Sequence, residues 1–186
     1  MYYVIKYTGD FGFIKPPTAN RSGLIFSQNY LTPANIRGIE KFLFPEELYL
    51  LSDYEPRIIR HRVYFRQRIQ TVETTHGRGT GLYKGIYRGK ATLQRHVLFN
   101  LIVHLAFSQE KYAQDAIKHH IHFGAKEHLL FPDKLILKMS PLEFKQIKGF
   151  EFITNNNHNN SILIGYDRYT QQPMTGQLIE TKGDVE

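Results

Sequence analysis

The stretch RIIRHRVYFRQRIQTVETTHGRGTGLYKGIYRGKATLQRH, residues 57–96, decides how this sequence is interpreted. It contains ten Lys or Arg residues and a single acid, Glu73, so it carries a net charge of +9, whereas the whole 186-residue chain carries +7. The positive excess of the protein is therefore concentrated in one segment. Such a concentration is typical of proteins whose partner is a polyanion.

The first half of this stretch alternates as a strand with one buried face does. We predict that one face is exposed and the other buried, with Gln67 as the exception on the buried face. The exposed face would carry Arg60, Arg62, Tyr64, Arg66 and Arg68, and the buried face Ile59, His61, Val63, Phe65 and Ile69. Guanidinium groups bind phosphate and tyrosine rings stack on bases, so this face would form a nucleic-acid platform. The alternative is an edge strand whose charges only prevent aggregation.

The second half, residues 76–91, places five glycines among basic and aromatic side chains. Glycine lets backbone amides approach a phosphate closely, so we predict a flexible basic loop that faces nucleic acid. The full set of predicted RNA contacts is Lys15, Arg21, Arg37, Arg60, Arg62, Tyr64, Arg66, Arg68, Arg78, Tyr83, Lys84, Tyr87, Arg88, Lys90, Arg95 and His96.

The composition narrows the class of protein further. The absence of cysteine excludes a disulfide framework and a thiolate metal site, and fits a reducing cytoplasm. No signal peptide is visible, and the longest apolar run, residues 98–107, is interrupted by polar residues, so we expect no membrane association. No nucleotide-phosphate motif or other cofactor motif is present. We expect one domain over residues 1–170 and a mobile C-terminal tail over residues 171–186.

Periodicity and capping residues predict the elements of this domain. Strands are expected at residues 2–8, 57–69, 93–107, 129–131, 135–139 and 161–166. In the strand at 93–107, the odd-numbered residues from Val97 to Phe107 would face the core. Thr32 followed by Pro33 predicts a helix over residues 33–43, and Ser108 and Ser140 each predict the start of another helix. Gly124 is expected to end the second helix.

The order of these elements predicts an α+β fold of the ferredoxin-like type. A strand, a helix, two strands, a second helix and a further strand form a split β-α-β unit, in which helices cover one face of an antiparallel sheet. The open face of such a sheet is the usual site for RNA.

Several segments, taken in order, resemble the repeat-associated (RAMP) superfamily of CRISPR systems, and most of all the subunit that caps the 5′ handle of the guide RNA in Cascade-type complexes. The matching residues are Phe13, Lys15, Pro16, Thr18, Ser27, Pro33, Ile36, Arg37, Gly38, Gln94, Arg95, Phe123, Gly124 and Glu127. The resemblance implies a ferredoxin-like core, a projecting basic thumb at about residues 70–92, tight binding of one RNA end and partner subunits. The C-terminal third has no counterpart in that pattern.

Three functions remain open from the sequence. The first is a non-catalytic subunit that holds the 5′ end of a guide RNA. The second is a metal-independent endoribonuclease, for which His96, Tyr87 and Lys90 are the candidate catalytic residues, with His96 as the base. A phosphate contact by His96 is the simpler interpretation of that residue. The third is a DNA-binding or structural protein with a basic docking surface.

A histidine cluster at residues 119, 120 and 122, with His128 nearby, raises the question of a metal. Adjacent histidines on a helix point apart, and no spacing typical of a metal site accompanies them. We therefore expect a structural or RNA-contacting cluster and no bound metal.

Overall fold

The computed structural model describes residues 1–16, 24–45, 55–75, 82–83, 86–87, 91–124, 127–154, 161–166 and 171–183. Its helices are α1 (Pro33–Leu43), α2 (Glu110–Ala116) and α3 (Pro141–Gln146). Its strands are β1 (Tyr2–Gly12), β2 (Leu24–Phe26), β3 (Ile58–Thr75), β4 (Leu82–Tyr83), β5 (Ile86–Tyr87), β6 (Ala91–Phe107), β7 (Ile121–His122), β8 (Leu129–Pro132), β9 (Leu137–Met139), β10 (Gly149–Thr154), β11 (Ile162–Tyr166) and β12 (Pro173–Thr181). Within these residues, no helix is long and apolar enough to cross a membrane.

One large sheet organises the described chain, which confirms an α+β fold. Its strand order is β11-β12-β10-β3-β6-β1-β8-β7, with β9 paired to β1. The pairs along this order are antiparallel, whereas the short β2 runs parallel to β6. The central strands β3, β6 and β1 therefore carry the core, and β10–β12 extend the sheet on one side.

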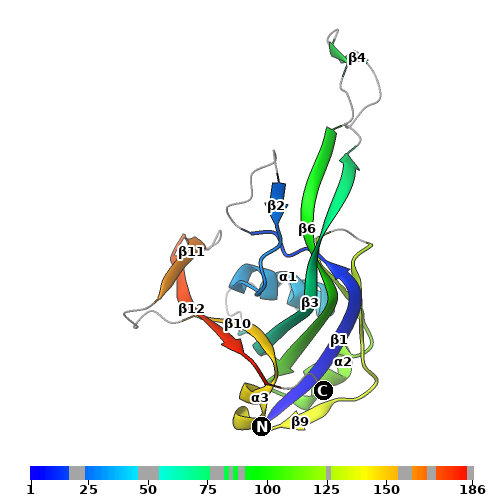
Figure 1. Ribbon diagram of the computed structural model, residues 1–186. Helices are drawn as coiled ribbons and strands as arrows, with labels where there is room; N and C mark the ends of the chain where they lie inside the picture. The colour runs from blue at the N-terminus through cyan, green and yellow to red at the C-terminus, as the bar shows by residue number, and fades with distance from the viewer. Residues whose placement is uncertain are drawn as a thin grey trace.

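The dominant feature is the hairpin of β3 and β6. The two strands stay paired from Ile58↔Phe107 to Thr75↔Ala91. Near its base β3 also pairs with β10, whereas its upper half rises out of the sheet, with β4 beyond its end (Figure 1). The described strands of this hairpin extend to Thr75 and Ala91, and much of the thumb that the resemblance implies at about residues 70–92 lies outside the described residues.

The main core lies between the sheet and helices α1 and α2. It contains alternating residues of β1 and β6, together with Ile39 and Leu43 of α1 and Ala113 and Ala116 of α2. The hydroxyl of Tyr7 donates a 2.8 Å hydrogen bond to the Ala116 carbonyl, which fixes α2 to β1.

The alternation predicted for β6 is wrong on one side of Asn100. This residue has a φ of 48°, in the left-handed region that asparagine tolerates better than most residues. Leu98 and Leu101 consequently both enter the main core, although they are three residues apart. Phe99, which we expected in the core, lies instead against the partly exposed ring of Phe11, with 5.5 Å between centroids.

The capping motifs predict two of the three helices correctly. Thr32 and Asn35 form a capping box at α1, and Ser140 and Glu143 form one at α3. The N-cap of α2 is Gln109, without a side-chain cap bond, and not Ser108. Gly124 does not end a helix either, because α2 ends at Ala116; Gly124 has a φ of +84° and follows β7.

Helix α3 lies on the opposite face of the sheet from α1 and α2, so the expectation of helices on one face is wrong. Phe144 packs with Val4 and Ala106, whose side chains alternate with those of the main core. The physical reason is that this end of the second face is also apolar and needs its own cover.

The C-terminal segment is a strand over much of its length, not the mobile tail that we expected. β12 pairs with β10 from Gly149↔Thr181 to Thr154↔Gly176 and also with β11. A Cβ placed on Gly176 would lie 2.3 Å from the Ile153 carbonyl oxygen, so the two strands approach closely there.

Candidate nucleic-acid interface

The base of β3 is an internal ion-pair cluster and not part of an exposed platform. Arg62, predicted to be exposed, is 1% exposed, and its Nη1 lies 2.8 Å from Oε2 of Glu151. Arg60 donates to the same carboxylate, with 2.7 Å between Nη2 and Oε2. Ile59, predicted to be buried, is 39% exposed, because the register shifts between Ile58 and Arg60.

Glu151 compensates the positive charge of the buried Arg62. It is 1% exposed and also accepts a 3.3 Å hydrogen bond from the His61 backbone amide. Burial lowers the pKa of Arg62 from its ordinary value, and Glu151 opposes that shift. An uncompensated charge in such a position would be strongly destabilising. Sequence reasoning missed Glu151; the available signal was one acid between Phe150 and Phe152.

The exposed cations of β3 lie above this base. Arg66 and Arg68 are exposed, as is Gln67 between them. The Arg68 guanidinium carbon lies 5.3 Å from the centroid of the Phe65 ring, which supports the cation without enclosing it. Tyr64 is half-buried, and the ammonium of Lys148 lies 5.2 Å from its ring. Of the five residues predicted to form the exposed platform, Arg66 and Arg68 are therefore the two that are exposed.

Arg95 and His96 lie on β6 opposite Thr71 and Gln70, further along the hairpin than Arg68. Arg95 Nη1 contacts Oε2 of Glu73 at 3.1 Å, and its guanidinium carbon lies 4.9 Å from the ring centroid of Phe13. The His96 ring stacks on Phe26 with a centroid distance of 4.3 Å and an interplanar angle of 13°. Phe26 is 51% exposed, so β2 brings an accessible aromatic ring to the hairpin that sequence reasoning did not single out.

Much of the predicted thumb falls outside the described residues: Arg78, Lys84, Arg88 and Lys90, together with Arg21 in the segment before β2. The backbones of Tyr83 and Tyr87 lie in β4 and β5, which pair with each other. Of the three candidate catalytic residues, His96 alone has a described side chain. The relative positions of the three candidate catalytic residues therefore lie outside the described part of the chain, and those assignments stay predictions.

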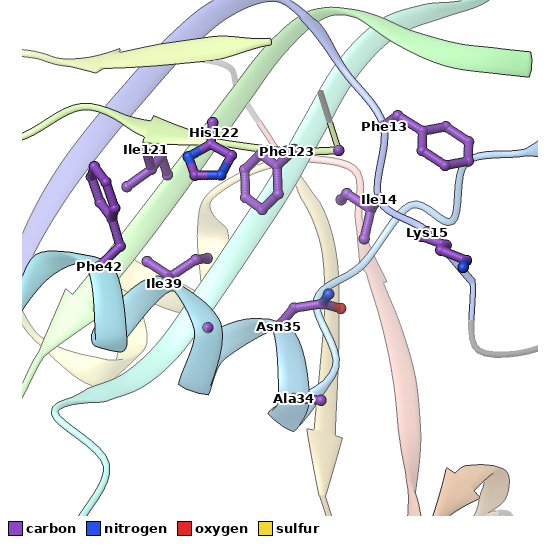
Figure 2. A pocket seen from close by; sticks show the side chains of 12 residues that line it. Phe13, Ile14, Lys15, Ala34, Asn35, Ile39, Phe42, Ile121, His122 and Phe123 are labelled. Carbon is purple, nitrogen blue, oxygen red and sulfur yellow. The ribbon is translucent and has the colours of Figure 1, made fainter. Parts of the chain in front are cut away.

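A cleft of about 280 Å³ lies on the helix side of the sheet, between α1 and two loop segments. Its walls are residues 34–42 of α1 on one side, and residues 13–15 and 121–124 on the other (Figure 2). Lys15, one of the predicted RNA contacts, is exposed at one end of this cleft. Arg37 is another predicted RNA contact, and it lies on α1 next to Gly38, which lines the cleft. Its positive charge acts to lower the pKa of the buried Glu40 carboxyl, against the larger effect of burial, which raises it.

Two residues of the predicted histidine cluster, His120 and His122, pack against phenylalanine rings. The Phe42 ring lies 5.4 Å from that of His120 and 5.6 Å from that of His122, and His120 lies 6.2 Å from the exposed ring of Phe131. Among the residues that the structure describes, no three histidine or acidic side chains gather as metal ligands. The cluster borders the cleft, because Phe42 and His122 line it.

The comparisons with known proteins rest on the fold. No protein-family model and no curated protein matches this chain. A chain of a solved structure described as "CRISPR RNA-guided surveillance complex" is similar in fold, with a TM-score of 0.54. The alignment covers 98% of this chain and 91% of that chain at 11% sequence identity. The architecture of the whole chain therefore matches a protein of a CRISPR RNA-guided complex, in agreement with the resemblance in the sequence.

Proposed function

We propose that this protein is a non-catalytic subunit of a CRISPR guide-RNA effector complex and holds the 5′ end of the guide RNA. The observation that carries the proposal is the match in fold over 98% of the chain to a protein of an RNA-guided complex. The sequence of residues 57–96 carries a charge of +9, and Arg66 and Arg68, which are exposed on β3, supply part of the chemistry for RNA.

The central topology supports the same proposal. Along the chain, β1, α1, β3, β6, α2 and β8 follow one another, and in the sheet these strands stand in the order β3-β6-β1-β8. We interpret this as the ferredoxin-like split β-α-β unit, extended by β10–β12. Proteins that contain this unit often bind RNA across the sheet and the elements beside it.

The RNA-binding surface that we propose comprises Arg66 and Arg68 of β3, His96 of β6, and Phe26 of β2. The two arginines are cations for phosphate, and the Phe26–His96 stack offers an aromatic surface for a base. The endoribonuclease alternative is not carried further, because no observation among the described residues favours it.

The test is to purify the protein with what it binds. The chain is expressed with its neighbouring genes, recovered by an affinity tag, and its RNA and protein companions are identified by sequencing and mass spectrometry. Small RNAs with a common 5′ end, together with partner subunits, are the expected result. Protein recovered free of RNA from cells that make guide RNA would contradict the proposal.

The binding surface is tested by salt titration. Arg66→Ala with Arg68→Ala should weaken binding of a single-stranded RNA and reduce the slope of log K against log[salt] by about 1.4, because each lost phosphate contact contributes about 0.7. The matched control is Lys134→Ala with Lys145→Ala, two exposed lysines outside the hairpin that remove the same charge. Equal slopes for the two double variants would show that the hairpin has no special role.

A further inference from the structure

The cleft beside α1 has the composition of a site for a single flat ligand with a negative group nearby. We propose that it holds one unpaired nucleobase of the bound RNA, stacked on Phe42, with the Asn35 amide at the edge of the base and Lys15 near its phosphate. This inference rests on the proposed RNA binding and adds a second contact region, separate from the β3–β6 hairpin.

The walls of the cleft are fixed before any ligand enters. The Phe13 amide donates to the Phe123 carbonyl at 3.2 Å, which joins the two loop segments of the upper wall. The Ile14 amide donates to Ser27 Oγ at 2.9 Å, and the Ile14 carbonyl accepts from the Gln28 amide at 3.0 Å. A wall held by these buried hydrogen bonds costs little ordering when a ligand binds.

The lower wall supplies a directed hydrogen-bond donor. Asn35 Oδ1 accepts from the Thr32 amide at 2.9 Å, from Thr32 Oγ1 at 2.8 Å and from Gln28 Nε2 at 3.2 Å. These three donors identify Oδ1 and leave the Nδ2 group of Asn35 as a donor on the cleft side. Figure 2 shows this amide extending from α1 toward Ile14 and Lys15. Nucleobases present carbonyl and ring-nitrogen acceptors that suit such a donor.

Aromatic rings line the end of the cleft that lies away from Lys15. Phe42 is 40% exposed although it belongs to a helix that packs on the core, and its ring stands 5.6 Å from that of His122 in a nearly perpendicular orientation. Figure 2 shows the rings of Phe42, His122 and Phe123 in the space between α1 and residues 121–124. At about 280 Å³ the cleft is at the lower limit of the usual range for ligand sites, about 300–1,000 Å³. One base fits such a space better than a larger ligand.

Gly38 gives the cleft its depth. A glycine in the middle of a helix is costly relative to alanine and often permits close approach of another backbone. Here, however, a Cβ placed on Gly38 would meet no heavy atom within 4 Å outside the helix itself. Packing therefore does not explain this glycine, whereas an occupied cleft does, because a side chain at position 38 would fill it.

The experiment combines a filled cleft with a scan of the RNA. A single-stranded RNA copying the 5′ end of the recovered small RNAs is synthesised with an abasic site at each position in turn. Binding is measured for the wild-type chain, Gly38→Leu and Gly38→Ala. Wild-type protein should lose about 5- to 150-fold in affinity at one abasic position, as expected for one stacked base. Gly38→Leu should lose the same factor with intact RNA and become insensitive to that position.

Gly38→Ala makes a similar change of helix propensity with a much smaller side chain, so it should lose less affinity than Gly38→Leu and keep part of the sensitivity to the abasic position. Thermal melting establishes that Gly38→Leu is folded. If it is not, Phe42→Ala, which removes the stacking ring, replaces it and should give the same insensitivity.

Wild-type affinity that does not depend on any single base, or Gly38→Leu with wild-type affinity, would overturn the inference and leave the proposed function in place. Loss of a co-purifying protein from Gly38→Leu with unchanged RNA binding would also overturn it, because the occupant would then be a protein side chain. Failure of the wild-type chain to bind RNA would instead reject the proposed function.

Discussion

Replacing Glu151 with alanine is the most decisive perturbation of the fold. The change leaves Arg62, which is 1% exposed, without its carboxylate partner, and it removes the acceptor of Arg60 and of the His61 amide. Breaking a buried pair by removing one member costs about 3–5 kcal/mol. For a chain of this size each kcal/mol lowers Tm by about 2–4 °C, so we expect a fall of about 6–20 °C.

The assay is thermal and urea unfolding of purified protein at neutral pH, with Asp115→Asn as the control. Asp115 pairs with Lys118 on the surface, with 2.9 Å between Oδ1 and Nζ, and both side chains are exposed. We expect no measurable effect from breaking that pair. Glu151→Gln, which keeps the shape but not the charge, should fall between the two.

A double variant separates charge from shape. Arg62→Met with Glu151→Leu removes both members of the buried pair, and such replacements are often neutral or stabilising. It should therefore recover the part of the stability that Glu151→Ala loses through unpaired Arg62, whereas Arg60 and the His61 amide still lack their acceptor. If Glu151→Ala melts within a degree or two of the Asp115→Asn control, the buried cluster does not have the role assigned to it here.

Other predictions concern protonation, one hydrogen bond and the hairpin. Burial lowers the pKa of both His61 and His104 from 6.5 to about 4, so the unfolded chain takes up their protons first as the pH falls. Stability should therefore fall between pH 6.5 and about 4, by about 1.4 kcal/mol per pH unit for each histidine. His104→Leu should make the fall in the urea midpoint shallower, and an unchanged pH profile would refute this. Tyr7→Phe should lower the unfolding free energy by about 1 kcal/mol in urea titrations through loss of its hydrogen bond to Ala116; no loss would mean that water replaces that bond. Replacing residues 76–90 by an Asn-Gly turn should preserve the circular dichroism spectrum and Tm, because positions 75 and 91 are paired, but weaken RNA binding; a lower Tm would show that the replaced segment belongs to the core.

The sequence was sufficient wherever the structure depends on neighbours in the chain. Helix α1 begins and ends at the predicted residues, because Thr32, Pro33 and Asn35 satisfy its first turn locally. The same local chemistry predicted α3. Strands β3 and β6 were also found at about their true positions, since their alternation of apolar and polar residues reflects one local period.

The sequence was insufficient wherever a residue depends on a distant partner. Alternation predicts which side chains share a face of β3, but not that α3 and β10 cover the base of its arginine face. The contact that buries Arg62 comes from Glu151, and nothing near Arg62 in the sequence indicates it. The left-handed conformation of Asn100 interrupts a local pattern that is otherwise correct, and the alternation of residues does not predict it.

The candidate site divides in the same way. Its charge was evident from composition, and Arg66, Arg68 and His96 were predicted individually. The cleft could not be predicted, because its walls come from residues 13–15, 34–42 and 121–124. Phe26 was missed because β2 is a short strand whose role depends entirely on its pairing with β6.

The ion-pair cluster also has a mechanical consequence for the hairpin. β3 is about 60 Å long at about 3.3 Å per residue, and the ion-pair cluster at Arg60 and Arg62 fixes its base in addition to the pairing with β6 and β10. A small rotation at this base becomes a displacement of many ångströms at the free end. A charged cluster restricts rotation because its hydrogen bonds have preferred directions, whereas an apolar cluster would hold the strand with less angular control. Variants at position 151 should therefore change where the arm points even when the protein remains folded.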